Sequence, residues 1–415
     1  MQPRFSRRWV IFLVSSALFV LSQFYRATIA VITPQLISDL SLNTQEISLM
    51  SAAFFYAFAL MQIPIAIYLD QIGSKKTMIM LNLIAVAGAV IFGTASTSHM
   101  LTIGRALLGV GMACNLMGTL KLTAEWFGPR QFATLAAVVF SMGTAGNIIA
   151  TTPLVFLVQS IGWRFSFLLV ALINLLLIIF FSQTVRDAPE APSADQANSP
   201  RLKETLSGIW ELFNIRDYWI ISLSTFCRYG IFAAIQGLYA GPYLIFVMGL
   251  PPVTAGNIIM GMNLGFICGG PFFGWISDRK LGTRKWVIIP GLLGFASILA
   301  MFAVLPPGTG IFPLVSFFFV LGVFNSSAGI MYPHIKERMP PDKSGMAMTG
   351  INFFTMIGPA VFLQGLGVIM QTAYPNNAWS PTAFQHVFWI CSVCLLFVSV
   401  LYTLTSDKAA ASQAV

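Results

Sequence analysis

The chain has 415 residues and a formal net charge of +9, and 57% of its residues are hydrophobic whereas only 9% are charged. Soluble domains carry roughly 25% charged residues, so this composition excludes a large soluble core and indicates an integral membrane protein.

At about 20 residues per membrane-spanning helix, the hydrophobic segments predict an all-α fold of about twelve transmembrane helices. The expected centres lie near residues 20, 58, 87, 112, 145, 173, 230, 265, 294, 322, 358 and 395. The first segment begins after Arg7-Arg8-Trp9 and continues past residue 30 without a small-residue cleavage site. We therefore expect a retained first helix and not a signal peptide.

Residues 186–216 form the one long polar interruption and are rich in Pro, Ala and Ser. This stretch predicts a cytoplasmic linker, in which residues 202–213 could form an amphipathic helix on the membrane surface. The linker would separate an N-terminal six-helix bundle, residues 1–185, from a C-terminal six-helix bundle with a short tail, residues 217–415.

The two halves repeat each other at an offset of about 202–212 residues. Ser22-Gln-Phe-Tyr-Arg26 in the first expected span matches Ser224-Thr-Phe-Cys-Arg228 in the seventh. The loop at residues 68–76, after the second span, matches the loop at residues 275–285, after the eighth. Several matches in the same order indicate an internal duplication and a parallel repeat.

Arg26 and Arg228 lie deep inside apolar segments, where an arginine costs about 2.5–3.5 kcal/mol on insertion scales. Each guanidinium presents five donors in a fixed fork that fits a carboxylate or phosphate. All fourteen acidic residues lie at span ends, in loops or in tails. The repeat therefore predicts two positive groups facing one cavity that holds an anion; the alternative is neutralisation by helix carbonyls or by a carboxylate elsewhere.

The distribution of positive charge predicts the topology. If the amino terminus is inside, 18 of the 23 Lys and Arg residues fall in inner loops and termini, and the expected outer loops hold none. This positive-inside bias predicts that both termini are cytoplasmic and argues against a nucleic-acid-binding patch. Compact loops and short tails favour a bacterial inner membrane, with a eukaryotic organelle as the alternative. The five cysteines fall in apolar spans and indicate neither a disulfide nor a metal site.

At this point the chain resembles the major facilitator superfamily over nearly its whole length. The loops at residues 70–76 and 278–285 follow its pattern Asp-[Arg/Lys]-x-Gly-x-[Arg/Lys]-[Arg/Lys], although Gln71 and Ala66 depart from it in the first copy. Further hallmarks are Arg105-Ala-Leu-Leu-Gly109-Val-Gly111-Met-Ala113, Gly162-Trp163-Arg164 and Gln236-Gly-Leu-Tyr-Ala-Gly-Pro242-Tyr243-Leu244. Arg26 resembles the span-one arginine of the organic-anion branches, in which it binds the substrate, sometimes with a span-seven partner like Arg228.

Further substrate candidates share a polar side chain inside an apolar span. Those we favour beside the two arginines are Tyr25, Asn115, Gln236, Tyr239 and Asn352. Gln236 follows Arg228 by eight residues, about two helical turns along the same face. Weaker candidates, which could equally hold helices together, are Gln23, Asn147, Tyr243, Asn263 and Asn325.

Candidates for coupling are Arg105, Lys121, Glu125 and His334. Lys121 and Glu125 are four residues apart and form either a helix-end pair or a cavity wall with a proton carrier. His334 matches Lys121 in the repeat and could titrate near neutral pH, or be a satisfied helix-end residue. The resemblance ties Arg105 to proton exchange in antiporters; a structural bond to nearby carbonyls is the alternative.

The repeated loops should form inner-face charge clusters that bias alternating states, with Asp70 and Asp278 either capping the next helix or pairing with basic residues across the halves. The gating residues are Asp70, Gly73, Lys75, Lys76, Asp278, Arg279, Gly282, Arg284 and Lys285.

The sequence predicts a secondary active transporter that moves a small organic anion by alternating access. The anion would be a carboxylate, a phosphorylated metabolite, or an amino acid or peptide held by its carboxylate. Its transport would be proton symport, exchange with a counter-anion, or uniport. The alternatives are a drug or metabolite efflux antiporter and a transporter-like ligand sensor. No hydrolase motif or cofactor loop is found, so we expect no enzyme activity, no cofactor and a monomer in the lipid bilayer.

Overall fold

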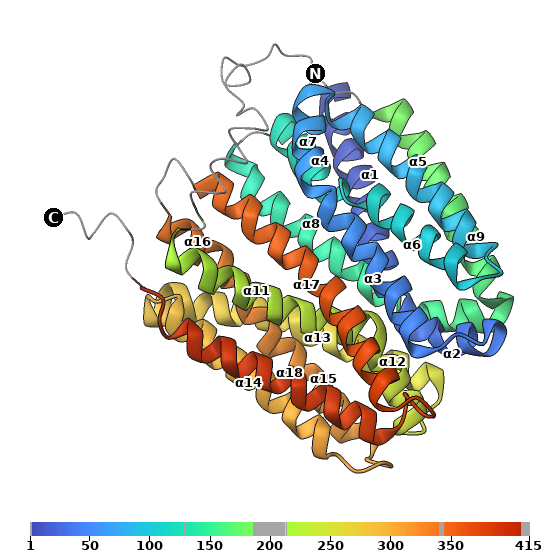
Figure 1. Ribbon diagram of the computed structural model, residues 1–415. Coiled ribbons are helices and arrows are strands. Elements are labelled where there is room, and N and C mark those ends of the chain that lie inside the picture. Colours follow the sequence, from blue (N-terminus) through green and yellow to red (C-terminus); the bar gives the residue numbers. More distant parts are fainter. Residues whose placement is uncertain (1, 128, 186–211, 213, 340–343, 408–415) are drawn as a thin grey trace. The chain divides into compact units, whose positions relative to one another are not determined.

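The computed structural model describes residues 2–127, 129–185, 212, 214–339 and 344–407 (Figure 1). Over these residues the chain forms helices and turns and no strand, so the expected all-α fold is confirmed. The expected linker and its amphipathic helix lie almost entirely outside the described residues.

The helices pack into two compact units. The first comprises Met1–Leu42 and Ala53–Pro200, and the second comprises Asn43–Ala52 and Arg201–Val415. The short segment 43–52 therefore packs with the second unit, although the repeat places it in the N-terminal half.

Helices up to residue 184 follow one another with few intervening residues. They are α1 (Gln2–Ala27), α2 (Ile29–Leu40), α3 (Thr44–Leu60), α4 (Gln62–Gln71), α5 (Ser74–Gly93), α6 (Ser98–Met112), α7 (Asn115–Phe127), α8 (Pro129–Ile149) and α9 (Thr152–Thr184). In the first unit α5 packs against α6 and α9, and α1 packs against α7 and α8 (Figure 1). Helix α9 kinks at Gly162, whose φ of 77° is a backbone conformation that glycine adopts readily.

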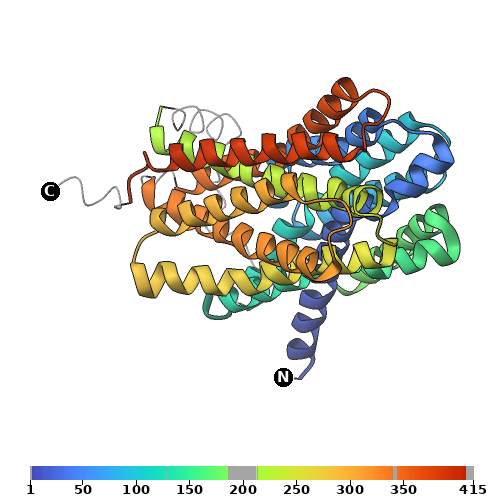
Figure 2. The same cartoon turned by 90° about the horizontal axis from the view of Figure 1, so that it is seen from below.

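The helices from residue 216 onward form the second unit. They are α11 (Arg216–Ala234), η2 (Ile235–Tyr239), α12 (Ala240–Pro242), η3 (Tyr243–Val247), α13 (Pro252–Trp275), η4 (Ile276–Leu281), α14 (Lys285–Val304), α15 (Ile311–Ser326), η5 (Ser327–Ile330), α16 (Met331–Arg338), α17 (Ser344–Ala373) and α18 (Pro381–Tyr402). The green-to-red helices run alongside one another in both views, with α13 against α15, α11 against α17 and α14 against α18 (Figures 1 and 2).

Ten helical segments of the described chain are long and apolar enough to cross a membrane. The two expected spans missing from this set are the pair α3 and α4, which are separated by a turn at Met61, and α8, of which Thr134–Ile149 forms a shorter apolar helix among the residues described. Helix α9 shows why a bilayer is needed: Phe165, Leu172 and Leu176 recur at helical spacing and are 68%, 51% and 56% exposed. Such a stripe must be covered by lipid, so this is a multi-pass membrane protein.

Candidate functional site

Arg26 lies near the C-terminal end of α1 and is half-buried. Its guanidinium carbon is 4.3 Å from the centroid of the Phe58 ring on α3. An aromatic face attracts a cation without neutralising it, because the ring carries a quadrupole and no net charge. The contact therefore orients the guanidinium, and the ring itself does not neutralise its charge.

Arg105 is the other arginine of this part of the first unit, and it is almost completely buried. Its Nη1 donates a 2.6 Å hydrogen bond to the carbonyl oxygen of Tyr25, and its guanidinium lies over the Phe54 ring at 4.7 Å. Of the two expected roles, the geometry shows the structural bond to a carbonyl. Because Tyr25 precedes Arg26, this bond fixes the backbone that carries the candidate substrate ligand.

Tyr25 and Asn115 lie in the interior of the first unit. The Tyr25 side chain is fully buried and its ring centroid is 6.2 Å from that of Phe167 on α9. The Asn115 amide donates to the Leu18 carbonyl at 3.0 Å and exchanges hydrogen bonds with Asn82 at 2.7 and 3.2 Å. In this conformation both side chains hold helices together and are not presented to a solute.

Arg228 lies in the middle of α11 and is 5% exposed. Its Nη1 donates to the side-chain Oδ1 of Asn325 at 2.7 Å and to the Asn325 carbonyl at 3.1 Å, and its guanidinium lies 5.6 Å from the Tyr229 ring centroid. Both hydrogen-bond acceptors are neutral. Among the described residues, Arg228 has no carboxylate partner, so its charge is buried and oriented but not neutralised.

The other candidates of the second unit also have partners inside it. Gln236 Nε2 donates to Asn263 Oδ1 at 2.6 Å, and the Tyr239 hydroxyl donates to the Leu363 carbonyl at 2.7 Å. Asn352 is half-buried and its Oδ1 lies 3.3 Å from the Tyr332 hydroxyl. The π-helical turns η2 and η3 interrupt α-helical geometry from residue 235 onward, so side chains after this point are rotated relative to a regular helix.

Two of the coupling candidates, Lys121 and Glu125, lie on α7. The Lys121 ammonium donates a 2.6 Å hydrogen bond to the Leu69 carbonyl, and Glu125 is exposed. The bond joins α7 to α4 through a backbone carbonyl.

His334 on α16 is fully buried between two partners. Its Nε2 lies 3.0 Å from the Ser406 carbonyl and its Nδ1 lies 2.7 Å from the Tyr402 hydroxyl. A carbonyl can only accept, so Nε2 carries the proton and the Tyr402 hydroxyl donates to Nδ1. The neutral ring is fully satisfied, which fits the helix-end role that the sequence left open.

A network of charges occupies one end of the second unit, which we call the charged end: Asp217, Asp278, Arg284, Lys285, Glu337, Arg338 and Asp407. Arg284 forms ion pairs with Asp278 and, at 3.0 Å, with Glu337. The hydrogen bond to Glu337 raises the pKa of Arg284 above its ordinary value. Arg338 on α16 pairs with Asp217 on α11 at 2.7 Å. These contacts tie the ends of four helical segments together.

Asp407 caps the helix after the second repeated loop. Its Oδ1 accepts the backbone N–H groups of Arg284 and Lys285 at 3.0 and 3.1 Å, and its Oδ2 accepts from the Thr283 hydroxyl. The alternative that Asp278 caps this helix is therefore wrong, because Asp278 pairs with Arg284 and an aspartate beyond the last span occupies the helix N-terminus. A carboxylate there satisfies free N–H groups and the positive end of the helix dipole.

We expect Asp407→Asn to lower the free energy of unfolding by about 1 kcal/mol, as is typical for loss of a cap. Burial acts to raise the pKa of Asp407, but the hydrogen bonds lower it below its ordinary value of 3.8. The contribution of the charged cap is thus complete above that value and is lost as pH falls through the folded-state pKa. Thermal melting of both proteins should show a difference at neutral pH that shrinks on strong acidification; an unchanged difference would contradict the charged cap.

The remaining gating candidates lie at the matching loop ends. Gly73 and Gly282 have φ values of 92° and 60°, which glycine tolerates and which lets each loop turn sharply. Lys76 and Arg279 are exposed and Lys75 is half-buried. The side chain of Asp70 lies outside the described part of the structure.

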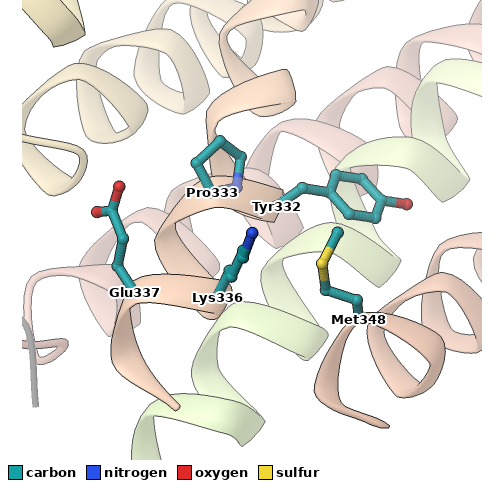
Figure 3. A pocket seen from close by; sticks show the side chains of 5 residues that line it. All are labelled: Tyr332, Pro333, Lys336, Glu337 and Met348. Atoms are coloured by element: carbon teal, nitrogen blue, oxygen red, sulfur yellow. The ribbon is translucent and has the colours of Figure 1, made fainter. Parts of the chain in front are cut away.

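A pocket opens beside the charged end of the second unit (Figure 3). It has a volume of about 530 Å³ and is lined by Tyr332, Pro333, Lys336, Glu337 and Met348. Sequence reasoning counted Lys336 only as an inner-loop charge, because nothing local shows that α17 completes a pocket around it. The role of Asp407 was missed for the same reason: its partners are more than 120 residues away.

Comparisons with known proteins show relatives that transport organic solutes. The probable sulfoacetate transporter SauU of Cupriavidus necator is 23% identical over 384 residues, covering 87% of this chain and 88% of that protein. The hexuronate transporter of Escherichia coli is 25% identical over 318 residues, covering 69% and 72%. The sialic acid transporter NanX of Escherichia coli is 25% identical over 285 residues, covering 68% and 67%.

Solved transporter structures share the fold. A point mutant of the nucleoside transporter NupG aligns with a TM-score of 0.80 at 15% identity, covering 95% of this chain and 99% of that chain. A bacterial homolog of the human lysosomal transporter Spinster, inward-facing and unoccupied, aligns with a TM-score of 0.76 at 16% identity, covering 97% of both. The sequence profile described as Major Facilitator Superfamily matches residues 12–256 and 221–414. The chain therefore belongs to the major facilitator superfamily of transporters.

Proposed function

We propose that this transporter carries a small organic anion, and that Arg26 and Arg228 each contribute a guanidinium to its binding. The observation that best supports this proposal is the environment of Arg228. Its side chain is buried among neutral partners, and Asn325 accepts both hydrogen bonds from Nη1 of the guanidinium. An unneutralised guanidinium in an apolar span is costly unless an anion completes it during the transport cycle. Its Nε atom has no partner among the described residues and is a donor that an anion could use.

Arg26 supports the same reading from the first unit. Its contact with Phe58 orients the fork, and the Arg105 bond to the Tyr25 carbonyl holds the preceding residue. These contacts pre-organise the Arg26 side chain and the backbone beside it, which reduces the entropy lost when an anion binds. Alternating access would then require the two halves to rock about the bound anion.

The relatives narrow the class of anion. Sulfoacetate, hexuronates and sialic acids, named for the three transporters above, all carry a carboxylate on a small polar body. We propose a carboxylate of this size as the substrate. We further propose an inner-membrane location with both termini cytoplasmic, which the positive-inside bias of the loops supports.

Coupling by exchange with a counter-anion fits this site better than proton symport. A buried carboxylate is the usual proton carrier, and the fourteen acidic residues of the sequence lie at span ends, in loops or in tails. The neutral His334 ring, at the charged end, has hydrogen-bond partners at both nitrogens. An imposed pH gradient should therefore drive little uptake, whereas preloading vesicles with the same anion should accelerate it.

The test is thermal stability of the purified protein against anionic, zwitterionic and cationic solutes, including sulfoacetate and glucuronate. We expect anions alone to raise the melting temperature, and we expect the increase to be smaller in the Arg26→Gln/Arg228→Gln double variant while it remains folded. Ligand present at a hundred times its dissociation constant stabilises by about 2.7 kcal/mol, which is readily detected. Equal stabilisation of both proteins by cations or neutral solutes would reject the anion site and favour efflux.

A further inference from the structure

The pocket beside the charged end has one ammonium group directed into it. In Figure 3 the Lys336 amine points between Tyr332 and Pro333, whereas the Glu337 carboxylate is turned to the other side. Lys336 is exposed and has no hydrogen bond or ion pair with any residue that the structure describes. The pocket thus offers a solvated ammonium beside apolar walls.

The neighbouring polar groups of the pocket already have partners. Glu337 pairs with Arg284 at 3.0 Å, so its charge is directed away from Lys336. The Tyr332 hydroxyl lies 3.1 Å from the Thr355 hydroxyl and 3.3 Å from Asn352 Oδ1. Besides Glu337, whose charge is paired with Arg284, the pocket is lined by the ammonium, the Tyr332 ring, the Pro333 ring and the Met348 side chain. This combination suits a ligand with one anionic group and a short apolar body.

We propose that this pocket is an anion-binding subsite in which Lys336 holds the carboxylate or sulfonate of a small organic anion. Its charged group comes from α16 and its far wall from α17, and no described contact joins Lys336 to Arg228 on α11. Its role as a docking point for the transported solute rests on the proposed function, but anion binding in the pocket does not.

The charge of the pocket can be measured without knowing the substrate. Met348→Cys, in a Cys268→Ser background that removes an exposed native thiol, places a reporter in the pocket wall. We compare its rates of reaction with an anionic and a cationic methanethiosulfonate reagent, and subtract the rates of the Cys268→Ser parent. Adding Lys336→Gln should lower the anion-to-cation rate ratio about tenfold, as expected for removing one nearby charge in water, and Lys336→Arg should restore it. An unchanged ratio overturns the proposal.

Occupancy is tested by protection of the same thiol in detergent. We expect glucuronate or sulfoacetate at millimolar concentration to slow labelling at least severalfold, and we expect Lys336→Gln to abolish this protection. Protection by neither anion overturns the subsite. Protection only by phosphatidylglycerol in nanodiscs would assign the pocket to a lipid headgroup and also overturn the proposal.

This experiment separates the subsite from the proposed function. Protection should persist in the Arg26→Gln/Arg228→Gln variant, because Lys336 does not depend on those arginines. If protection survives there while the anion panel shows no arginine-dependent stabilisation, the proposed function fails and the subsite stands. Loss of protection in the folded double variant would instead show that the anion binds elsewhere, and would overturn the subsite.

Discussion

Replacing Asn325 with aspartate should abolish anion transport while leaving the protein folded. The new carboxylate would occupy the position of Oδ1, which lies 2.7 Å from Arg228 Nη1. It would form a buried ion pair with Arg228 and neutralise the charge that we propose for the anion. Losing one partner of a buried charge interaction costs about 2–5 kcal/mol, so uptake into liposomes should fall by about a hundredfold or more.

The matched control for this prediction is Asn325→Ala. Alanine removes the hydrogen bond to the side chain but keeps the positive charge, and the Asn325 carbonyl still accepts from Arg228 at 3.1 Å in the native structure. We expect this variant to keep measurable uptake with a raised KM. Wild-type transport by Asn325→Asp, with an unchanged melting temperature, would show that the charge of Arg228 is not used. The ion pair also predicts that Asn325→Asp melts no lower than Asn325→Ala.

Gly265→Ala should strongly destabilise the second unit, because α13 and α15 approach each other there without room for a side chain. A Cβ on Gly265 would collide with the backbone carbonyl of Phe319. The reverse contact exists too, since a Cβ on Gly322 would meet the backbone of Met262. Small residues allow such close approach in membranes, and forced overpacking typically costs about 1–3 kcal/mol.

The control lies on the same helix. A Cβ on Gly274 meets no atom within 4 Å, so Gly274→Ala should change the melting temperature little. Both variants gain the same helix propensity, and the difference between them isolates the collision. Equal melting temperatures for the two variants would mean that the helices separate at no cost, contrary to the packing argument. Detergent-solubilised thermal melting, followed by size-exclusion chromatography, measures this directly.

The arginines of the candidate site have partners that are distant from them in the sequence. Arg228 and Asn325 are 97 residues apart in the chain, and Arg105 is 80 residues from its acceptor at Tyr25. Each arginine is therefore placed by a helix that lies several membrane crossings away in the chain. This explains why residues with similar sequence contexts have different partners: Arg26 faces an aromatic ring, whereas Arg228 faces an amide.

The fold could be predicted because it depends on the local pattern of hydropathy along the sequence. Hydropathy over about 20 residues sufficed to place the spans, because a bilayer requires every backbone group in it to be satisfied within a helix. Two expected spans are missing from the long apolar segments: the one divided by the turn between α3 and α4, and the one formed by α8. The repeated loops and their glycines were equally readable, since a sharp turn with positive φ needs glycine wherever it occurs.

By itself, therefore, the sequence determined the all-helical membrane fold, because hydropathy is a property of contiguous residues, and it predicts the duplication and the depth of Arg26 and Arg228. Only the tertiary structure decided which polar groups meet. It assigned Asn325 to Arg228, the Tyr25 carbonyl to Arg105 and Asp407 to the start of α14. These choices depend on helix packing between distant segments, where an uncharged acceptor and a carboxylate are equally able to satisfy a donor and only geometry selects between them.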